Sequence, residues 1–378
     1  MYFIEKSKGP NPFKLFDYHL FFAILMLSAI GLIVLRSATA NLTGGSSVLT
    51  KQIVFFAIGV FVALFISALD YKSFRYFAMV FYILSLILLI VVLFKGIGQE
   101  QWGSKSWLQV PFIGSFQPSE LMKIGTIIFA SIYFGKIKDG EKIAINALKA
   151  VIIFLLPLGL VFLQPDYGTA LVFIFMFILM VFIAGIRYRY MIITAIASIP
   201  VFTFAWVFLL NAQRQARILV FLNPDLDPLG SGYHVKQLIK AIGSGQFFGK
   251  GLFQGIQTQL GGIPERDTDS IFAVIGEELG FIATFLIVAL IFFIIIRSIY
   301  IAKKSRDSYG SFMAIGITGM LGFHFIENIG MSMGLLPVTG IPLPFISAGG
   351  SSMLTNFIAV GVLLSISMRR KRAIFNQK

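Results

Sequence analysis

The sequence has 378 residues, of which 57% are hydrophobic and only 13% are charged, and its mean hydropathy is +0.87. Soluble domains carry about 25% charged residues, so this composition excludes a soluble globular protein and predicts an integral membrane protein. The net charge of +14 is spread over short loops, which argues against a nucleic-acid-binding protein, and the absence of cysteine excludes disulfides and thiolate metal sites.

Apolar runs long enough to cross about 30 Å of hydrocarbon recur along the whole chain. They show no period-2 alternation and therefore favour helices over a β-barrel. The first run ends near a signal-peptidase-like Ala38-Thr39-Ala40, but it is longer than a cleaved signal, so we expect it to remain as a span. The sequence predicts an all-α polytopic membrane protein with ten helices, near 18–36, 52–69, 74–94, 118–135, 145–163, 169–186, 190–210, 271–296, 311–336 and 351–368.

Lysine and arginine concentrate in alternate short loops and at both ends of the chain. The positive-inside rule then places both termini in the cytoplasm. We expect one integral-membrane domain with a cytoplasmic tail at 1–17, a long extracytoplasmic loop at 211–268 between spans seven and eight, and a basic cytoplasmic tail at 369–378. A loop of that length in a compact membrane protein is usually functional, so the chemistry is expected on the outer face.

Three ionisable residues begin spans four and six at the same predicted depth: Glu120, Lys123 and Asp166. Glu120 and Lys123 are three residues apart and share one helix face. One interpretation is a self-neutralising pair that lets a helix end enter lipid, since a lone charge there costs about 2.5 to 3.5 kcal/mol. The other is a polar cavity, which the additional carboxylate of Asp166 favours.

Arginines follow at the outer membrane surface, at Arg214, Arg217 and Arg266. They either meet lipid phosphates or hold a pyrophosphate, for which arginine offers bidentate geometry. A glycine-rich run between Gly243 and Gly255 permits close backbone approach to such an anion, although glycine loops alone are weak evidence.

Carboxylates crowd the stretch 265–278, just before a long uncharged segment. Asp267 and Asp269 form an Asp-x-Asp pattern that suits a divalent cation such as Mg²⁺ or Mn²⁺. Three-residue patterns also occur by chance, and capping of the next helix would by itself explain either Asp269 or Ser270, so the cation is the less favoured interpretation and no cofactor is assigned.

Several long motifs, in one order along essentially the whole chain, resemble the SEDS family of bacterial membrane glycosyltransferases (RodA, FtsW and SpoVE). The motifs are Gly103-Ser-Lys-Ser-Trp107, Phe116-Gln-Pro-Ser-Glu-Leu121, Gln164-Pro-Asp-Tyr-Gly-Thr169, Ala241-Ile-Gly-Ser-Gly245, Pro264-Glu-Arg through Asp269, Glu277-Glu-Leu-Gly280, and Asn328 through Pro344.

This resemblance implies polymerisation of lipid II into peptidoglycan strands outside the bacterial cytoplasmic membrane. The family's proposed catalytic aspartate falls on Asp269, a candidate general base for an inverting transfer with undecaprenyl pyrophosphate as the leaving group. Substrate-binding candidates are Trp107, Glu120, Lys123, Asp166, Arg214, Arg217, Arg266, Lys105 and Ser347. The resemblance also implies a class B penicillin-binding protein as the transpeptidase partner, alongside membrane lipid.

The chain departs from the family at three positions near these motifs. Family members usually have His at 267, Phe at 270 and Tyr at 348, where this chain has Asp267, Ser270 and Ala348. A second carboxylate beside Asp269 would raise its pKa or recruit a cation. Pro264-Glu265-Arg266 and the short N-terminal tail are more similar to RodA, the elongation member, than to FtsW.

Two other classes of function fit parts of the sequence. A lipid-linked-sugar flippase would use ten spans with buried charges such as Glu327. A noncatalytic cell-wall scaffold would explain the spans but not the outward charges. A division or sporulation paralogue is the alternative within the family.

Overall fold

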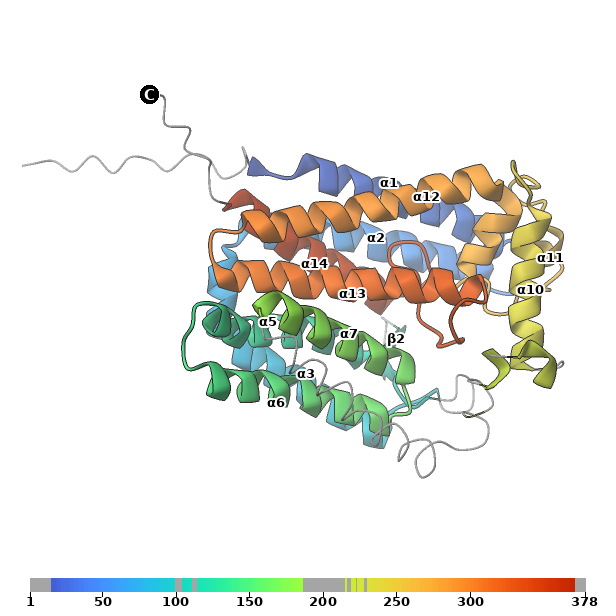
Figure 1. Cartoon of the computed structure of the whole chain (residues 1–378). Helices are drawn as coiled ribbons and strands as arrows, with labels where there is room; N and C mark the ends of the chain where they lie inside the picture. Colours follow the sequence, from blue (N-terminus) through green and yellow to red (C-terminus); the bar gives the residue numbers. More distant parts are fainter. Residues whose placement is uncertain are drawn as a thin grey trace, which may run out of the picture.

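A computed structural model describes residues 15–98, 104–110, 114–185, 215, 219–221, 223–227 and 230–370. Long helices lie side by side in a bundle, and α10 crosses one end of it (Figure 1). The predicted span at 190–210, Arg214, Arg217 and most of both tails lie outside the described residues. The long helices are α1 (Tyr18–Ala38), α2 (Gly45–Ala68), α3 (Phe74–Lys95), α5 (Pro118–Lys138), α6 (Ile143–Leu163), α7 (Tyr167–Ala184), α12 (Ile271–Lys304), α13 (Ser308–Ser332) and α14 (Gly350–Met368).

Nine of the ten predicted spans therefore coincide with a helix. Eight helices in the described part of the chain are long and apolar enough to cross a membrane. The helix that is not among them is α5, which carries Glu120 and Lys123 and packs between α3, α6 and α13. Because other helices cover α5, it can be more polar than helices that face lipid. The all-α polytopic membrane fold is thus confirmed.

Shorter elements lie between the long helices. The hairpin of β1 (Leu108–Val110) and β2 (Gly114–Phe116) is antiparallel, with Leu108 opposite Phe116. The loop predicted at 211–268 contains the turn η4 (Pro224–Leu226), α10 (Ser231–Ser244) and the single turn α11 (Ile256–Gln259). A further turn, η2 (Tyr71–Ser73), precedes α3.

The central helices are α13 and α14. In these two helices 78% and 83% of the residues in an apolar 18-residue stretch are buried inside the protein, whereas the corresponding shares for α2 and α12 are 17% and 22%. Helix α5 begins at one end of the bundle, beside the N-terminus of α14, where the Gln117 backbone N–H donates to Ser351 Oγ over 3.3 Å. We call this the site end. The start of α1 and the end of α14 meet at the opposite end, where Ser367 Oγ donates to the Leu15 carbonyl.

Helix α12 is kinked at Gly280, whose backbone has φ 74° and ψ −174°. A side chain at this position would collide with the backbone of Gly249. The loop 245–251 pairs with the kinked turn, where the Phe281 N–H donates to the Gln246 carbonyl over 2.8 Å. The span predicted at 271–296 is therefore two helical segments joined at a glycine, and the second segment continues to Lys304.

Candidate active site

Asp269 lies at the site end, immediately before α12, on a segment fixed by contacts from two neighbours. Asn328 Nδ2 of α13 donates to the Asp269 carbonyl over 2.8 Å and to the Ile341 carbonyl over 2.7 Å. The loop between α13 and α14 thereby lies against Asp269. In this loop Gly340 has φ +75°, and a Cβ built there would lie 3.1 Å from Asp269 Oδ2. A glycine at 340 leaves room for the carboxylate.

Ser347 holds the other side of the same segment. Its hydroxyl donates to the Thr268 carbonyl over 2.6 Å and accepts from the Leu343 N–H over 2.8 Å, while the Ala348 N–H donates to the Asp267 carbonyl. Ser347 is buried, and both roles of its hydroxyl are used within the protein. The geometry therefore gives Ser347 a positioning role, whereas the sequence suggested substrate binding.

The Asp269 carboxylate itself is half-buried and, among the described residues, receives no hydrogen bond. Burial, together with the neighbouring carboxylates of Glu265, Asp267 and Asp166, raises its pKa to about 7. A carboxyl group that is half ionised near neutral pH, and not already hydrogen-bonded, is suited to accept a proton from a substrate.

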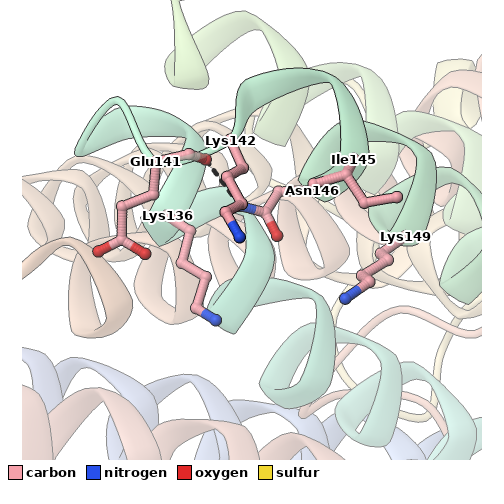
Figure 2. Close-up of a pocket in the computed structure, with 6 residues that line it drawn as sticks. All are labelled: Lys136, Glu141, Lys142, Ile145, Asn146 and Lys149. Carbon is pink, nitrogen blue, oxygen red and sulfur yellow. Dashed lines mark hydrogen bonds between the residues drawn. The ribbon is translucent and has the colours of Figure 1, made fainter.

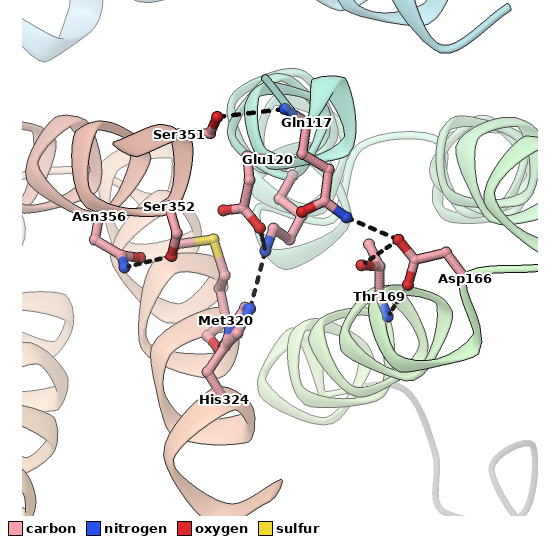
Figure 3. A network of polar contacts seen from close by, with 10 residues as sticks. Gln117, Glu120, Asp166, Thr169, Met320, His324, Ser351, Ser352 and Asn356 are labelled. Atoms are coloured by element: carbon pink, nitrogen blue, oxygen red, sulfur yellow. Dashed lines mark hydrogen bonds and ion pairs between the residues drawn. The ribbon is translucent and has the colours of Figure 1, made fainter. Parts of the chain in front are cut away.

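Asp166 caps the start of α7 close to this carboxylate. Its oxygens accept from the Thr169 N–H over 3.1 Å, from Thr169 Oγ1 over 3.0 Å and from Gln117 Nε2 over 2.9 Å (Figure 3). Burial raises the pKa of Asp166, partly offset by the hydrogen bonds from Thr169. Gln117 and Thr169 thus join the first turns of α5 and α7 at one carboxylate.

Glu120 and Lys123 form a buried ion pair of 2.8 Å on α5, as their spacing predicted. The Lys123 ammonium also contacts His324 Nε2 of α13 at 2.9 Å, while His324 Nδ1 lies 2.7 Å from the Met320 carbonyl (Figure 3). Because Nδ1 can only donate to a carbonyl, Nε2 accepts from Lys123 and the imidazole is neutral. The chain has three histidines, and one in the middle of an apolar span was the available signal for this partner.

The remaining predicted site residues divide into two groups. Lys105 lies near Asp166, since the Lys105 N–H donates to the carbonyl of Gln164, two residues before Asp166, over 3.2 Å. Trp107 follows two residues after Lys105 and forms an antiparallel bridge with Ile97. The Lys105 ammonium donates to the Phe94 carbonyl over 3.2 Å. Arg266, by contrast, is buried and donates to the Thr258 carbonyl, so its guanidinium does not face outward as expected.

Glu277 has a structural role in this region. Its carboxylate accepts from the backbone N–H groups of Gln257 and Thr258 over 2.9 and 2.8 Å, and pairs with Lys250 at 3.2 Å. The glycine-rich run also packs on α12, where the Gly251 N–H donates to the Glu278 carbonyl over 2.9 Å. The glycines at 245, 249 and 255 thus permit close contact with another helix, and approach of the run to an anion stays a prediction.

The metal-binding hypothesis has limited support in the residues. In the part of the chain that the structure describes, no three His, Asp or Glu side chains are grouped so that they could hold a metal ion. Asp267 and Asp269 would contribute carboxylates, and any further ligands would have to come from substrate phosphates or water.

The site-end arrangement can be compared with known proteins. The family model for FtsW, RodA and SpoVE, described as a cell cycle protein, matches residues 18–372. The chain belongs to the FtsW/RodA/SpoVE family. It is 38% identical over 357 residues to stage V sporulation protein E of Bacillus subtilis, covering 93% of this chain and 96% of the relative.

Other members of the family have similar identities. The probable peptidoglycan glycosyltransferase FtsW of Trichlorobacter lovleyi is 36% identical over 371 residues, and the match covers 96% of each chain. The peptidoglycan glycosyltransferase MrdB of Escherichia coli K12 is 33% identical, with 92% of each chain covered. These similar values do not single out RodA as the most similar branch.

Solved structures of the family share the fold. A chain from a peptidoglycan synthase complex, whose structure concerns coordination of polymerization and crosslinking, has a TM-score of 0.80 at 29% identity and covers 93% of this chain and 97% of its own. The rod shape determining protein RodA of Thermus thermophilus has a TM-score of 0.69 at 26% identity and covers 94% and 98%.

Proposed function

We propose that this chain is a peptidoglycan glycosyltransferase that polymerises lipid II at the outer face of the bacterial cytoplasmic membrane. The observation that carries the proposal is the half-buried Asp269 carboxylate, which has a pKa near 7 and no hydrogen-bond donor among the described residues, beside the cluster of Asp166, Glu120 and Lys123. The relatives named as peptidoglycan glycosyltransferases support the same activity.

The proposed reaction forms one C–O bond and breaks another. Asp269 takes the proton of a sugar 4-hydroxyl as that oxygen attacks the anomeric carbon of lipid II, and undecaprenyl pyrophosphate leaves from the opposite face with inversion. The leaving group departs as an anion and needs positive charge more than a proton. Lys123, Lys105, Arg214 and Arg217 are the proposed source of that charge, and Trp107 is proposed to contact the substrate.

The proposed topology follows from the same assignment. If the site end faces outward, the start of α1 and the end of α14 face the cytoplasm, in agreement with the basic loops. The synthase complex among the structural neighbours supports a single-pass class B penicillin-binding protein as partner. The RodA-like pattern at Pro264-Glu265-Arg266 supports a role in cell elongation and rod shape.

Transport of the lipid-linked sugar is the principal alternative to polymerisation. A transporter needs polar groups along a path through the membrane, whereas Glu120, Asp166 and Asp269 gather at one end of the bundle. Purified protein in detergent separates the two functions, because detergent leaves no compartments between which to transport.

We expect purified protein incubated with labelled lipid II in detergent to yield glycan polymer. Absence of polymer, even after the penicillin-binding partner is added, would favour transport or a scaffold. A divalent cation at Asp267 and Asp269 is a second proposed means of neutralising the pyrophosphate. Loss of polymer in EDTA and its recovery with Mg²⁺ would support that cation.

Polymerisation is expected to accelerate as pH rises through about 7, because Asp269 must lose its proton to act as a base and its pKa is raised to about 7. Asp267→Asn removes one neighbouring negative charge, so it should move the midpoint of the pH–rate curve down by about half to one unit. Asp225→Asn removes a carboxylate that is 79% exposed and should leave the midpoint in place. Equal midpoints in wild type and Asp267→Asn would contradict the assignment.

A further inference from the structure

Two adjoining cavities open at the end of the bundle opposite Asp269. Helix α5 connects the two ends, since Glu120 lies in its first turn and Lys136 in its last, about 24 Å apart at 1.5 Å per residue. The smaller cavity has a volume of about 440 Å³ and the larger about 600 Å³. They share Lys136 and Glu141, and neither belongs to the proposed catalytic site.

The larger cavity has a balanced lining, with three basic side chains and three acidic ones: Lys72, Arg75, Lys136, Asp139, Glu141 and Asp307. Lys72 lies 3.4 Å from Asp307, and Ser308 Oγ lies 2.6 Å from Asp139. Tyr71, adjacent in the chain to Lys72, also donates to Asp307. These contacts join the turn η2 and the end of α5 to the start of α13, and with the balanced charge they give the larger cavity no excess attraction for an anion.

The smaller cavity has an excess of positive charge. Its lining contains three lysines against a single carboxylate, that of Glu141, and Figure 2 shows these side chains around the junction of α5 and α6. Within the described chain, none of the three lysines forms an ion pair. The ammonium groups of Lys136 and Lys149 lie 5.9 and 5.5 Å from the centre of the Tyr133 ring. The cavity therefore presents unneutralised cations at one place.

The start of α6 adds to this positive field. No side chain caps the helix, and no acidic residue lies in its first turn. Instead Lys142 precedes it, and the amide of Asn146 is used on the Glu141 carbonyl over 2.7 Å. A helix N-terminus carries partial positive charge, so it strengthens the attraction of the lysines for an anion.

An exposed apolar stripe leads away from the lysines along α6. Ile145, Leu148, Ile152 and Leu155 are spaced by three or four residues and are 45%, 54%, 46% and 56% exposed. They therefore share one helix face, with Lys142 and Lys149 at its start. A free phosphate or an acidic peptide would use the lysines alone, whereas a phospholipid would place its headgroup on the lysines and an acyl chain along the stripe.

We propose that the cavity between α5 and α6, lined by Lys136, Lys142 and Lys149, binds the headgroup of an anionic phospholipid whose acyl chain lies along the exposed face of α6. The inference does not depend on the proposed enzymatic activity, because the cavity lies at the other end of the bundle. Positive charge in loops also sets topology, so the test compares lysines at the cavity with lysines elsewhere at the same end.

Native mass spectrometry of the purified protein with phosphatidylglycerol or phosphatidylcholine of identical acyl chains provides the test. We expect wild type to retain phosphatidylglycerol in preference, and Lys142→Gln/Lys149→Gln to weaken that retention on the order of tenfold. The matched control is Lys303→Gln/Lys304→Gln, which removes two exposed charges at the end of α12 that do not line the cavity, and this variant should retain the lipid like wild type.

Three results would overturn the proposal. Equal retention of the two lipids would show that headgroup charge is not recognised. Equal losses in the two double variants would show that the cavity lysines are not special. Displacement of phosphatidylglycerol by excess inorganic phosphate as readily as by more of the lipid would indicate a general anion site. All four substituted lysines are exposed, so the variants are expected to fold, and circular dichroism checks this.

Discussion

A purified Asp269→Asn variant is expected to polymerise lipid II about 10²- to 10⁴-fold more slowly than wild type, the usual contribution of a general base. Asparagine keeps the size of the side chain but cannot accept the proton of the attacking hydroxyl. The backbone contact from Asn328 to the 269 carbonyl does not involve the side chain and should persist. Rates of polymer formation at saturating lipid II measure the loss.

Stability measurements separate this loss of base from a loss of structure. The pKa of Asp269 is raised from 3.8 to about 7 in the folded protein, so its ionised form opposes folding once the pH exceeds the unfolded value. Replacing it with a neutral amide removes that penalty. The variant should therefore be at least as heat-stable as wild type at pH 8, while its slow residual rate no longer titrates near pH 7.

Two results would contradict the role of Asp269. A variant that polymerises at the wild-type rate would exclude it as the base. A variant that is slow but also unfolds at lower temperature would indicate that Asp269 supports the loop rather than the reaction. Asp225→Asn, in the same extracytoplasmic segment under the proposed topology, serves as the control for charge removal alone.

The sequence predicted those features of the site end that depend on neighbours in the chain. The spacing of Glu120 and Lys123 predicted their ion pair, because residues three apart on a helix face one another. Asp166 at the start of an apolar run was placed at a helix N-terminus, where it does cap α7. The apolar runs located nine helices, because a span has few alternatives in lipid.

Contacts between distant segments could not be read from the sequence. His324 is 201 residues from Lys123, and Ser347 is 79 residues from Thr268. The non-helical backbone of Gly280 could not be predicted from its neighbours in the chain, because it packs against the backbone of Gly249, 31 positions earlier. Arg266 was expected to face an anion because of its charge, but its guanidinium is buried and donates a hydrogen bond to the Thr258 carbonyl in α11.

These long-range contacts also change the expected role of Lys123. The residue was a candidate for holding the leaving pyrophosphate, but its side chain is only 1% exposed and its ammonium lies between Glu120 and a neutral His324. The primary role of Lys123 is thus to neutralise the buried carboxylate of Glu120. Whether it also serves the substrate is a separate question, which a pair of variants can answer.

Lys123→Met is expected to destabilise the protein by about 3 to 5 kcal/mol, because it leaves the Glu120 carboxylate buried without its cation. A fall in the thermal midpoint of the detergent-solubilised protein measures this effect. The double variant Glu120→Gln/Lys123→Met removes both charges and should recover most of the loss, since a buried ion pair is often replaceable by neutral groups of similar size.

Polymerisation by the double variant then tests the second role. If Lys123 also stabilises the departing pyrophosphate, the double variant regains its thermal midpoint but not its rate, which is the result we expect. Recovery of both quantities would confine Lys123 to charge neutralisation and leave Lys105, Arg214 and Arg217 as the proposed cations. A single variant as stable as wild type would mean that Glu120 becomes neutral without the lysine, because a protonated carboxyl group costs little to bury.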